Sequence, residues 1–446
     1  MSLLTTRRLS GSAAWRPWAI RGLILIAFVA GFLKLSQHPA AAPFKPPAHA
    51  EPGRPPSVAS EGLSTRFVSP ESGPHRHAGS LIELKDGRIR AFWFSGSQEG
   101  APDVDIRSAV FAPSKRRWEG EASVIDRAAT QAALWRYVKK LGNPVPARAA
   151  DGRLHLFYVT VSLGGWAGSS ISMITSDDEG QTWGPARRLV SSPFINVSTL
   201  VKGTPFLYAD GRIGLPVYHE FIGNFGELLR IDGSGKVIDK QRLSHGRGSL
   251  QPVVLIQNAE RAQVLMRHAG PSRPNRVIGT STGDAGRHWT VAAKTSLPNP
   301  SAAVTGFALP EGPLLAVVNN IEANRDALSL MASTDGGKAW RTLATLEDQR
   351  AWRQGELVEA DFVAASGTLV RTTDASLNDV ESLVESARRH QCVRGRCSFE
   401  FSYPYLIRAA NGDAHLVYTW NRSAIKHVSF SRQWLEQRLK ALESGA

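Results

Sequence analysis

Short runs of alternating apolar and polar residues, each ended by a tight turn, repeat along the chain from about residue 65. Residues 81–93 alternate on both sides of the pair Asp86-Gly87, and an Asp-Gly pair between two alternating runs is a strong hairpin signal. The pattern predicts an all-β chain built from repeated hairpins. The same arrangement returns at three further turns, Asp151-Gly152, Asp210-Gly211 and Asn411-Gly412.

A second series of turns has a fixed spacing of a hydroxyl residue, an aspartate, a glycine and a tryptophan. Its three copies are residues 176–183, 282–289 and 333–340. The Ser or Thr and the Asp cap the backbone of a tight turn, the Gly supplies a positive φ, and the Trp folds back over the hairpin. The two series interleave, as four-stranded sheets require. We therefore expect the first series at inner hairpins and the second at outer hairpins.

The repeated octet resembles the Asp-box of sialidases and related β-propellers. One propeller blade takes about 40–50 residues. Trp289 therefore lies about one blade before Trp340 and about two blades after Trp183. Residues 232–235 have the glycines of such a turn without the tryptophan, and a degenerate turn ends near Trp118. With a last blade close to the C-terminus, the resemblance implies a six-bladed β-propeller of the sialidase fold.

The propeller is expected over residues 61–431, and the residues before it follow a different pattern. Arginines precede an apolar run at residues 22–33, which is short for a membrane-spanning helix and typical of a signal sequence. We favour an uncleaved signal-anchor that spans residues 1–38. The alternative is a signal peptide that is cleaved near residues 40–42. The propeller would then face the periplasm from the inner membrane, or be secreted after cleavage. Residues 39–60, rich in Pro and Ala, are expected to form a flexible tether.

Residues 347–398 interrupt the β pattern and are expected to form an insertion, with helical spacing at residues 376–386. The insertion ends in the only two cysteines, Cys392 and Cys397, which have no second ligand pair for a metal site. Outside the cytoplasm they would form a local disulfide, and in the cytoplasm they would be free thiols. A final amphipathic helix is predicted over residues 432–446.

The formal net charge of +14 limits the kind of partner. Much of it comes from the first 60 residues, but the folded part also remains basic, which suits an anionic ligand or surface. Nucleic acid is disfavoured, because no stripe of Lys and Arg with interleaved aromatic residues appears. Neither a metal nor a cofactor is expected, since the sequence has no metal-ligand spacing, no glycine-rich phosphate loop and no Gly-x-Ser-x-Gly elbow.

The resemblance to sialidases also implies a catalytic site. These enzymes clamp a substrate carboxylate with three arginines, attack with a tyrosine that is paired with a glutamate, and use an aspartate as acid/base. Guanidinium groups bind a carboxylate bidentately, and a neutral tyrosine approaches the acidic sugar with less repulsion than an anion. The positions that match are Arg76, Arg267 and Arg325 for the clamp, Tyr403 for the nucleophile and Asp103 for the acid/base.

One part of the family pattern is missing. The glutamate that would activate Tyr403 belongs upstream of Arg267, near residues 249–252, and no acid stands there. Glu220, from the preceding blade, is the expected substitute. His77 is compatible with either a core position or a position in the site. The resemblance places four further residues along the same central cleft: His77, Glu99, Arg422 and Lys426.

Several functions are compatible with these residues. The first is an exported, membrane-tethered glycoside hydrolase of the exo-α-sialidase type, acting on acidic-sugar glycans. The second is a non-catalytic propeller that binds acidic glycans, which the missing glutamate favours. The third is a hydrolase or lyase for uronic-acid polysaccharides, with His77 or Tyr403 as the base. Because one fold carries many activities, the geometry of the site has to distinguish them.

Overall fold

A computed structural model describes residues 16–36, 42–51, 62–69, 74–192, 196–244, 246, 248–310, 312–354 and 357–444. The chain divides into two compact units, Met1–Ala41 and Ala42–Ala446. In the first unit, helix α1 spans Arg16–Ser36. Within the described part of the chain, none of the helices combines the length and the apolar character needed to cross a membrane. Ala40 and Ala41, at the expected cleavage site, lie outside the described residues.

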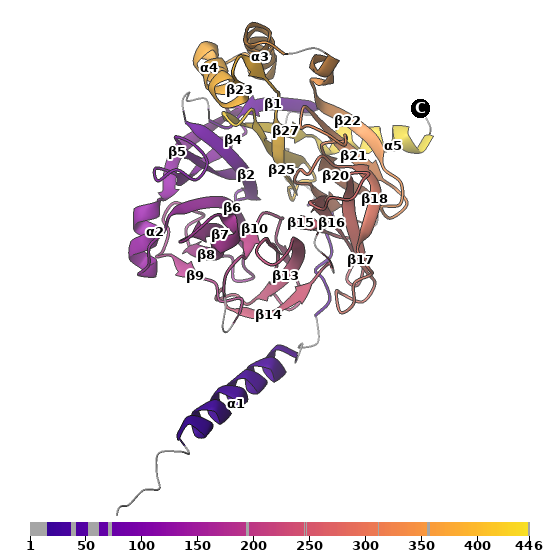
Figure 1. The fold of residues 1–446 in the computed structure, drawn as a ribbon. Helices are drawn as coiled ribbons and strands as arrows, with labels where there is room; N and C mark the ends of the chain where they lie inside the picture. Colours follow the sequence, from indigo (N-terminus) through magenta and orange to yellow (C-terminus); the bar gives the residue numbers. More distant parts are fainter. Residues whose placement is uncertain are drawn as a thin grey trace, which may run out of the picture. The chain divides into compact units, whose positions relative to one another are not determined.

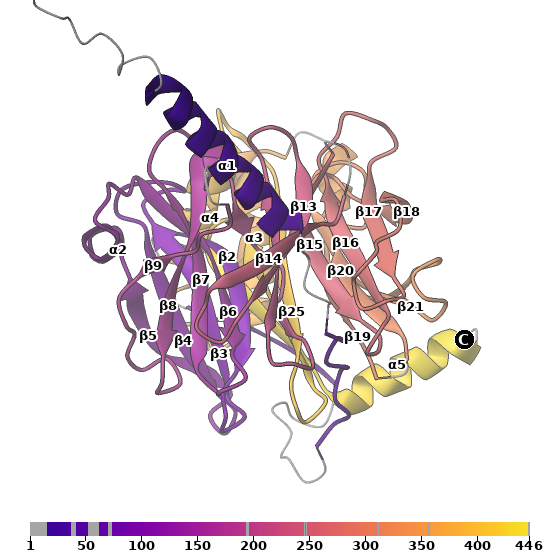
Figure 2. The same cartoon turned by 90° about the horizontal axis from the view of Figure 1, so that it is seen from below.

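The second unit is a β-propeller of six antiparallel sheets, which confirms the predicted fold. Figure 1 shows the six blades around a common centre, and Figure 2 shows the strands running side by side in the view turned by 90°. The strands of blades 1 and 2 are β2 (His75–Glu83), β3 (Ile89–Gly96), β4 (Asp105–Ala112), β5 (Arg117–Ile125), β6 (Lys140–Arg148), β7 (Leu154–Val161), β8 (Ser169–Ser176) and β9 (Arg187–Arg188). Those of blade 3 are β10 (Leu200–Val201), β11 (Phe206–Leu207), β12 (Ile213–His219), β13 (Phe225–Ile231) and β14 (Val237–Arg242).

The last three blades complete the ring. Blade 4 contains β15 (Ser249–Ile256), β16 (Ala262–His268), β17 (Arg276–Thr282) and β18 (Ala293–Pro298). Blade 5 contains β19 (Thr305–Ala308), β20 (Leu314–Val318), β21 (Ala327–Ser333) and β22 (Arg341–Asp348). Blade 6 contains β25 (Phe401–Arg408), β26 (Ala414–Trp420) and β27 (Ala424–Phe430). Its fourth strand comes from the other end of the domain, β1 (Leu63–Phe67), which pairs antiparallel with β27.

The predicted outer turns are confirmed in their positions and in their hydrogen bonds. In the first octet, Ser176 Oγ accepts a hydrogen bond from the Gly180 amide at 2.8 Å, and Asp178 accepts from the Thr182 amide at 2.8 Å. The hydrogen bonds from Thr182 hold the pKa of Asp178 at about 2. The other two octets repeat these bonds between β17 and β18 and between β21 and β22. Residues 232–235 form the corresponding turn in blade 3.

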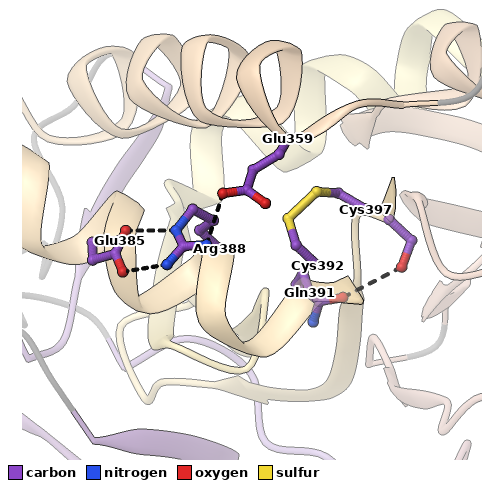
Figure 3. Close-up of a disulfide and its surroundings, with 7 residues drawn as sticks. Glu359, Glu385, Arg388, Gln391, Cys392 and Cys397 are labelled. Atoms are coloured by element: carbon purple, nitrogen blue, oxygen red, sulfur yellow. Dashed lines mark hydrogen bonds and ion pairs between the residues drawn. A yellow bond between two sulfur atoms is a disulfide. The ribbon is translucent and has the colours of Figure 1, made fainter. Parts of the chain in front are cut away.

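The expected insertion contains two helices, α3 (Glu359–Thr373) and α4 (Val380–Gln391), where the sequence predicted one. A short 3₁₀ helix, η2 (Arg350–Gln354), precedes them, and Cys392 is bonded to Cys397 across the hairpin of β23 (Cys392–Val393) and β24 (Arg396–Cys397). Figure 3 shows this disulfide next to Arg388, which pairs with Glu359 and Glu385 at 2.7 Å each. The predicted C-terminal helix is α5 (Arg432–Ser444).

Two further short helices lie on the second unit. Helix α2 (Arg127–Leu134) connects blades 1 and 2, and its N-terminus is capped by Asp126. The 3₁₀ helix η1 (Trp166–Gly168) lies in the loop between β7 and β8.

Residues 42–51 are packed against the propeller, and for these residues the expectation of a flexible tether is wrong. Phe44 is completely buried and contacts the rings of Phe206 and Tyr208. Backbone hydrogen bonds join this segment to Leu207 in blade 3 and, further along, to Ala410 in blade 6. The segment borders a cavity of about 490 Å³ at the C-terminal ends of the blades' first strands. The sequence missed this packing because Pro-rich composition does not show that one aromatic residue is anchored in a core.

Candidate active site

The site lies at the opposite ends of the same strands, where each blade contains a non-glycine residue with positive φ. Such a residue costs about 1–3 kcal/mol and persists where the surrounding structure holds it in place, often at functional sites. In four blades it coincides with a register shift in the first strand pair, as between Ser402 and Tyr405. The six residues with positive φ at this end of the propeller are Ala78 (55°), Asn143 (47°), Ser198 (57°), Gln251 (52°), Ser301 (59°) and Tyr403 (55°).

Two of the three predicted arginines meet at one of these residues. Arg267, at the end of β16, donates through Nε to Ser301 Oγ at 3.2 Å. Arg325, in the loop between β20 and β21, donates through Nη2 to the Ser301 carbonyl oxygen at 2.8 Å. Both guanidinium groups are partly exposed. The structure therefore brings together side chains from blades 4 and 5, as a carboxylate clamp requires.

Glu400 extends this cluster to blade 6. Its carboxylate accepts hydrogen bonds from Arg325 Nη1 at 3.1 Å, Arg422 Nε at 2.7 Å and Ser402 Oγ at 2.8 Å. Burial alone would raise the pKa of Glu400, but Arg422 and Arg325 outweigh it and hold the pKa below its usual range. Arg422 also donates to Glu99 at 3.1 Å. Glu99 and Arg422 are therefore part of the cluster, as expected, whereas Glu400 was missed.

Arg76 has a different position from the other arginines. It is almost fully buried in β2, and its Nη1 donates to the Ser423 carbonyl oxygen at 3.3 Å. Its backbone amide donates to the Arg422 carbonyl oxygen at 3.1 Å. Arg76 thus lies beneath the loop that carries Arg422. The guanidinium groups of Arg267, Arg325 and Arg422, in contrast, are partly exposed.

Tyr403 lies beside this cluster in contact with a buried histidine and near a buried lysine. Its ring centroid is 4.3 Å from that of His77 and 5.8 Å from Lys202 Nζ. Burial is the main cause that lowers the pKa of His77 far below the usual range, and the cations of Arg422 and Arg325 act in the same direction, so this ring is neutral. His77 is therefore both a core residue and a neighbour of the candidate nucleophile. Lys202 had not been identified from the sequence.

The position expected to hold the activating glutamate is occupied by Gln251. Its Oε1 accepts a hydrogen bond from Arg267 Nη1 at 3.4 Å, and its Nε2 donates to the Tyr218 hydroxyl at 3.5 Å. Asn143 Nδ2 donates to the same hydroxyl at 3.3 Å. Burial raises the pKa of Tyr218 well above its usual value, so it remains a neutral phenol. The amide of Gln251 cannot accept the proton of Tyr403 as a carboxylate would.

The two candidate acids have different surroundings. Asp103 is exposed in the loop between β3 and β4, where its carboxylate accepts from the Ser97 amide at 2.8 Å and from Ser97 Oγ at 3.0 Å. Glu220 follows β12, and its amide donates to Ser198 Oγ at 2.8 Å. Burial raises the pKa of Glu220, and the charges that oppose this effect are Arg267 and Lys140. Glu220 therefore retains its proton to higher pH than an ordinary glutamate.

The structure does not bring Lys426 into the cluster. Lys426 is buried in β27, and its Nζ lies 2.6 Å from Glu347 Oε1 of β22. The Tyr418 hydroxyl donates to the same oxygen at 2.6 Å. Strand alternation does not say which neighbouring blade a side chain meets, so the sequence could not distinguish this inter-blade ion pair from a cleft position.

The insertion reaches the rim of the site through α4. His390 Nδ1 lies 3.2 Å from Ser423 Oγ, next to Arg422, and its ring centroid is 5.3 Å from that of His75. The sequence had not assigned a role to this segment. Its contact with the Arg422 loop makes it part of the wall of the site.

A positional signal in the sequence could have located part of the ring of positive-φ residues. Ala78, Asn143 and Tyr403 each stand eight residues before an Asp-Gly or Asn-Gly inner turn. A proline also follows three residues of this ring: Asn143, Gln251 and Tyr403. Proline disfavours α geometry in the residue before it, but here that residue has a left-handed conformation. No such signal marks Lys202 or Glu400, which enter the site only through packing between blades.

Comparisons with known proteins agree with this architecture. A family model described as a BNR repeat-like domain matches residues 87–416. The Hadza microbial sialidase Hz136 has a similar structure, with a TM-score of 0.58 at 15% identity, covering 80% of this chain and 66% of that chain. A sialidase of Trypanosoma rangeli in complex with sialic acid gives a TM-score of 0.55 at 12% identity, covering 86% of this chain and 61% of that chain.

Shorter proteins match over nearly their whole length. The intramolecular trans-sialidase of Ruminococcus gnavus, in complex with oseltamivir carboxylate, has a TM-score of 0.54 at 11% identity, covering 81% of this chain and 95% of that chain. A protein of unknown function from Dyadobacter fermentans has a TM-score of 0.57 at 12% identity, covering 83% and 98%. A search of curated protein sequences finds no match. At these identities the structural likeness concerns the fold.

Proposed function

The chain belongs to the BNR repeat-like domain family, and we propose on this premise that it is an exported glycoside hydrolase of the exo-α-sialidase type. The observation that carries the proposal is the joint position of Arg267 and Arg325 on Ser301, beside a strained tyrosine on the adjacent blade. Three partly exposed guanidinium groups provide the bidentate donors that an acidic sugar needs. The expected substrate is a glycan that ends in such a sugar.

Arg267 is the guanidinium best suited to receive the substrate carboxylate. Its two hydrogen bonds go to the neutral groups Ser301 Oγ and Gln251 Oε1. Within the described residues it makes no ion pair, whereas Arg325 and Arg422 both pair with Glu400. We assign Arg267 to the carboxylate directly. Arg325 and Arg422 would orient it, and Arg76 would support the loop of Arg422.

The proposed reaction proceeds in two steps. Tyr403 Oη forms a bond to the anomeric carbon as the bond to the leaving oxygen breaks, and the phenolic proton passes to a base. Asp103, in its protonated form, gives its proton to the leaving oxygen. A water molecule then attacks the same carbon, Asp103 takes a proton from the water, and Tyr403 regains its proton as it departs. The surrounding structure holds Tyr403 at a positive φ in a bulged strand, which would fix its position for this attack.

The compartment proposed for this activity is the periplasm or the exterior of the cell. The Cys392–Cys397 disulfide supports export, because such bonds persist in oxidising compartments. The basic and apolar N-terminal segment supports either a signal-anchor or a cleaved signal peptide.

Substitution of Arg267 tests the proposed carboxylate clamp. Arg267→Met is expected to raise KM for a fluorogenic α-sialoside about 10–100-fold with a smaller change in kcat, because a charge-assisted hydrogen bond to the carboxylate is worth about 1.5–3 kcal/mol in both ground and transition states. Arg153→Met removes an exposed arginine at a distant turn and serves as the matched control. An unchanged KM in Arg267→Met would argue against the clamp.

The acid/base assignment distinguishes Asp103 from Glu220. A general acid matters little when the leaving group is an activated phenol and matters greatly when it is a sugar alkoxide, by about 10²–10⁴-fold. Asp103→Asn is therefore expected to lower kcat/KM for a sialyllactose far more than for an aryl sialoside, whereas Glu220→Gln should show no such difference between the two substrates. If Glu220→Gln shows the selective loss instead, its raised pKa identifies it as the acid.

A binding protein for acidic glycans is the second candidate function. It is favoured by Gln251, which stands where an activating carboxylate is expected. A wild-type protein that binds a sialoside and releases no product from sialosides or from uronic-acid glycans would support this alternative. Release from uronic-acid glycans alone would instead support the third function, a uronic-acid hydrolase or lyase.

A further inference from the structure

Lys202 is a buried lysine directly beneath the candidate site. It follows β10, is only 4% exposed, and its Nζ donates to the Pro404 carbonyl oxygen at 3.4 Å. The same nitrogen lies 4.9 Å from the ring centroid of Tyr405 and 5.8 Å from that of Tyr403. Within the described residues no carboxylate lies within ion-pair distance of Lys202, so its ammonium form would be a buried and uncompensated charge.

The groups that face Lys202 do not favour its charged form. They are neutral His77 on β2, the phenols of Tyr403 and Tyr405 on β25 and, around the same site, Tyr218 on β12. The charged groups that act on neighbouring His77 include Arg422 and Arg325, which are also cations. Burial lowers the pKa of Lys202 to about 7, so much of it carries no proton at neutral pH. A neutral amine is a base.

We propose that Lys202 takes the place of the missing glutamate and accepts the phenolic proton of Tyr403 across one bound water molecule. This inference rests on the proposed function. As Tyr403 Oη bonds to the anomeric carbon, its proton passes to the Lys202 amine, which becomes an ammonium. When water later displaces Tyr403, the ammonium returns the proton to the phenolate and no other proton acceptor is needed. Gln251 then has only a hydrogen-bonding role.

The pH dependence of kcat/KM in the full-length protein tests this role. The wild type is expected to gain activity as the pH rises through about 7, the pH at which Lys202 loses its proton. Lys202→Met and Lys202→Gln are expected to lose at least about 10²-fold in kcat/KM at pH 7 and to lose this rise in activity with pH, because the amine that accepts the proton is absent. Lys202→Gln retains an N–H donor for Pro404, so a merely structural role predicts normal activity in this variant. Lys139→Met, an exposed lysine, is the matched control.

A second measurement does not depend on catalysis. The folded-state pKa of Lys202 lies below that of an unfolded lysine, about 10.4, so the unfolded chain binds more protons between these values. The denaturation midpoint of the wild type, relative to Lys202→Met, should therefore rise with pH from about 7 to about 10. A constant difference means that Lys202 stays charged, which overturns its role as a base.

The outcomes separate the two proposals. If the rise of kcat/KM with pH through about 7 is absent from both Lys202 variants, the inference is supported. If the wild type is active and both variants keep the same rise with pH, the role of Lys202 is overturned and the sialidase function is left intact. A wild type that cleaves no sialoside overturns the proposed function and the proton transfer together, even if the midpoint titration shows an uncharged Lys202.

Discussion

Tyr403→Phe is expected to reduce kcat/KM for α-sialosides by at least about 10³-fold, or about 4 kcal/mol of transition-state stabilisation. The substitution removes the one oxygen that would bond to the anomeric carbon. It keeps the ring that lies 4.3 Å from His77, so the bulge in β25 should be preserved. The measurement is initial-rate kinetics on a fluorogenic α-sialoside with circular dichroism as a check on folding.

Tyr405→Phe is the matched control for this experiment. It removes the same hydroxyl group two residues further along the same strand, from a side chain that is fully buried. Its activity should remain within a few-fold of the wild type. Comparable activity in Tyr403→Phe would remove the tyrosine nucleophile from the mechanism. Sialoside binding retained by an inactive wild type would support the glycan-binding alternative.

Glu347→Gln is expected to lower the free energy of unfolding by about 3–5 kcal/mol, because it leaves the ammonium of Lys426 buried without its counter-charge. The two side chains are 3% and 6% exposed and lie 2.6 Å apart. Glutamine keeps an oxygen that can accept from the Tyr418 hydroxyl, so the substitution isolates the loss of charge. Chemical denaturation followed by tryptophan fluorescence measures the effect.

The double variant Glu347→Leu with Lys426→Met provides the control. Replacing both members of a buried ion pair with apolar groups of similar volume is often neutral or stabilising. The double variant should therefore recover most of the stability lost in Glu347→Gln. A loss below about 1 kcal/mol in Glu347→Gln would be typical of an exposed pair and would mean that water reaches this site.

The repeated turns could be predicted from the sequence because their chemistry is local. Ser176, Asp178 and Gly180 stand within one turn of each other, and their hydrogen bonds depend on spacing along the chain alone. The Asp-Gly and Asn-Gly turns are equally local. Counting both series, together with the resemblance to sialidases, predicted six blades. The expectation that Arg267, Arg325 and Tyr403 share one site came from that resemblance.

Only the tertiary structure decided what surrounds these residues. Lys202 lies far from Tyr403 in the sequence, and Glu400 pairs with Arg325 of the neighbouring blade. The roles of both depend on which side chains meet between blades. Positive φ in the first strands also breaks the simple alternation of faces, so the strand pattern cannot say which side chains point into the site. Contacts between residues distant in sequence also close the ring through β1 and bury Phe44. Local turn chemistry determines the blades, whereas contacts between residues distant in sequence determine the site.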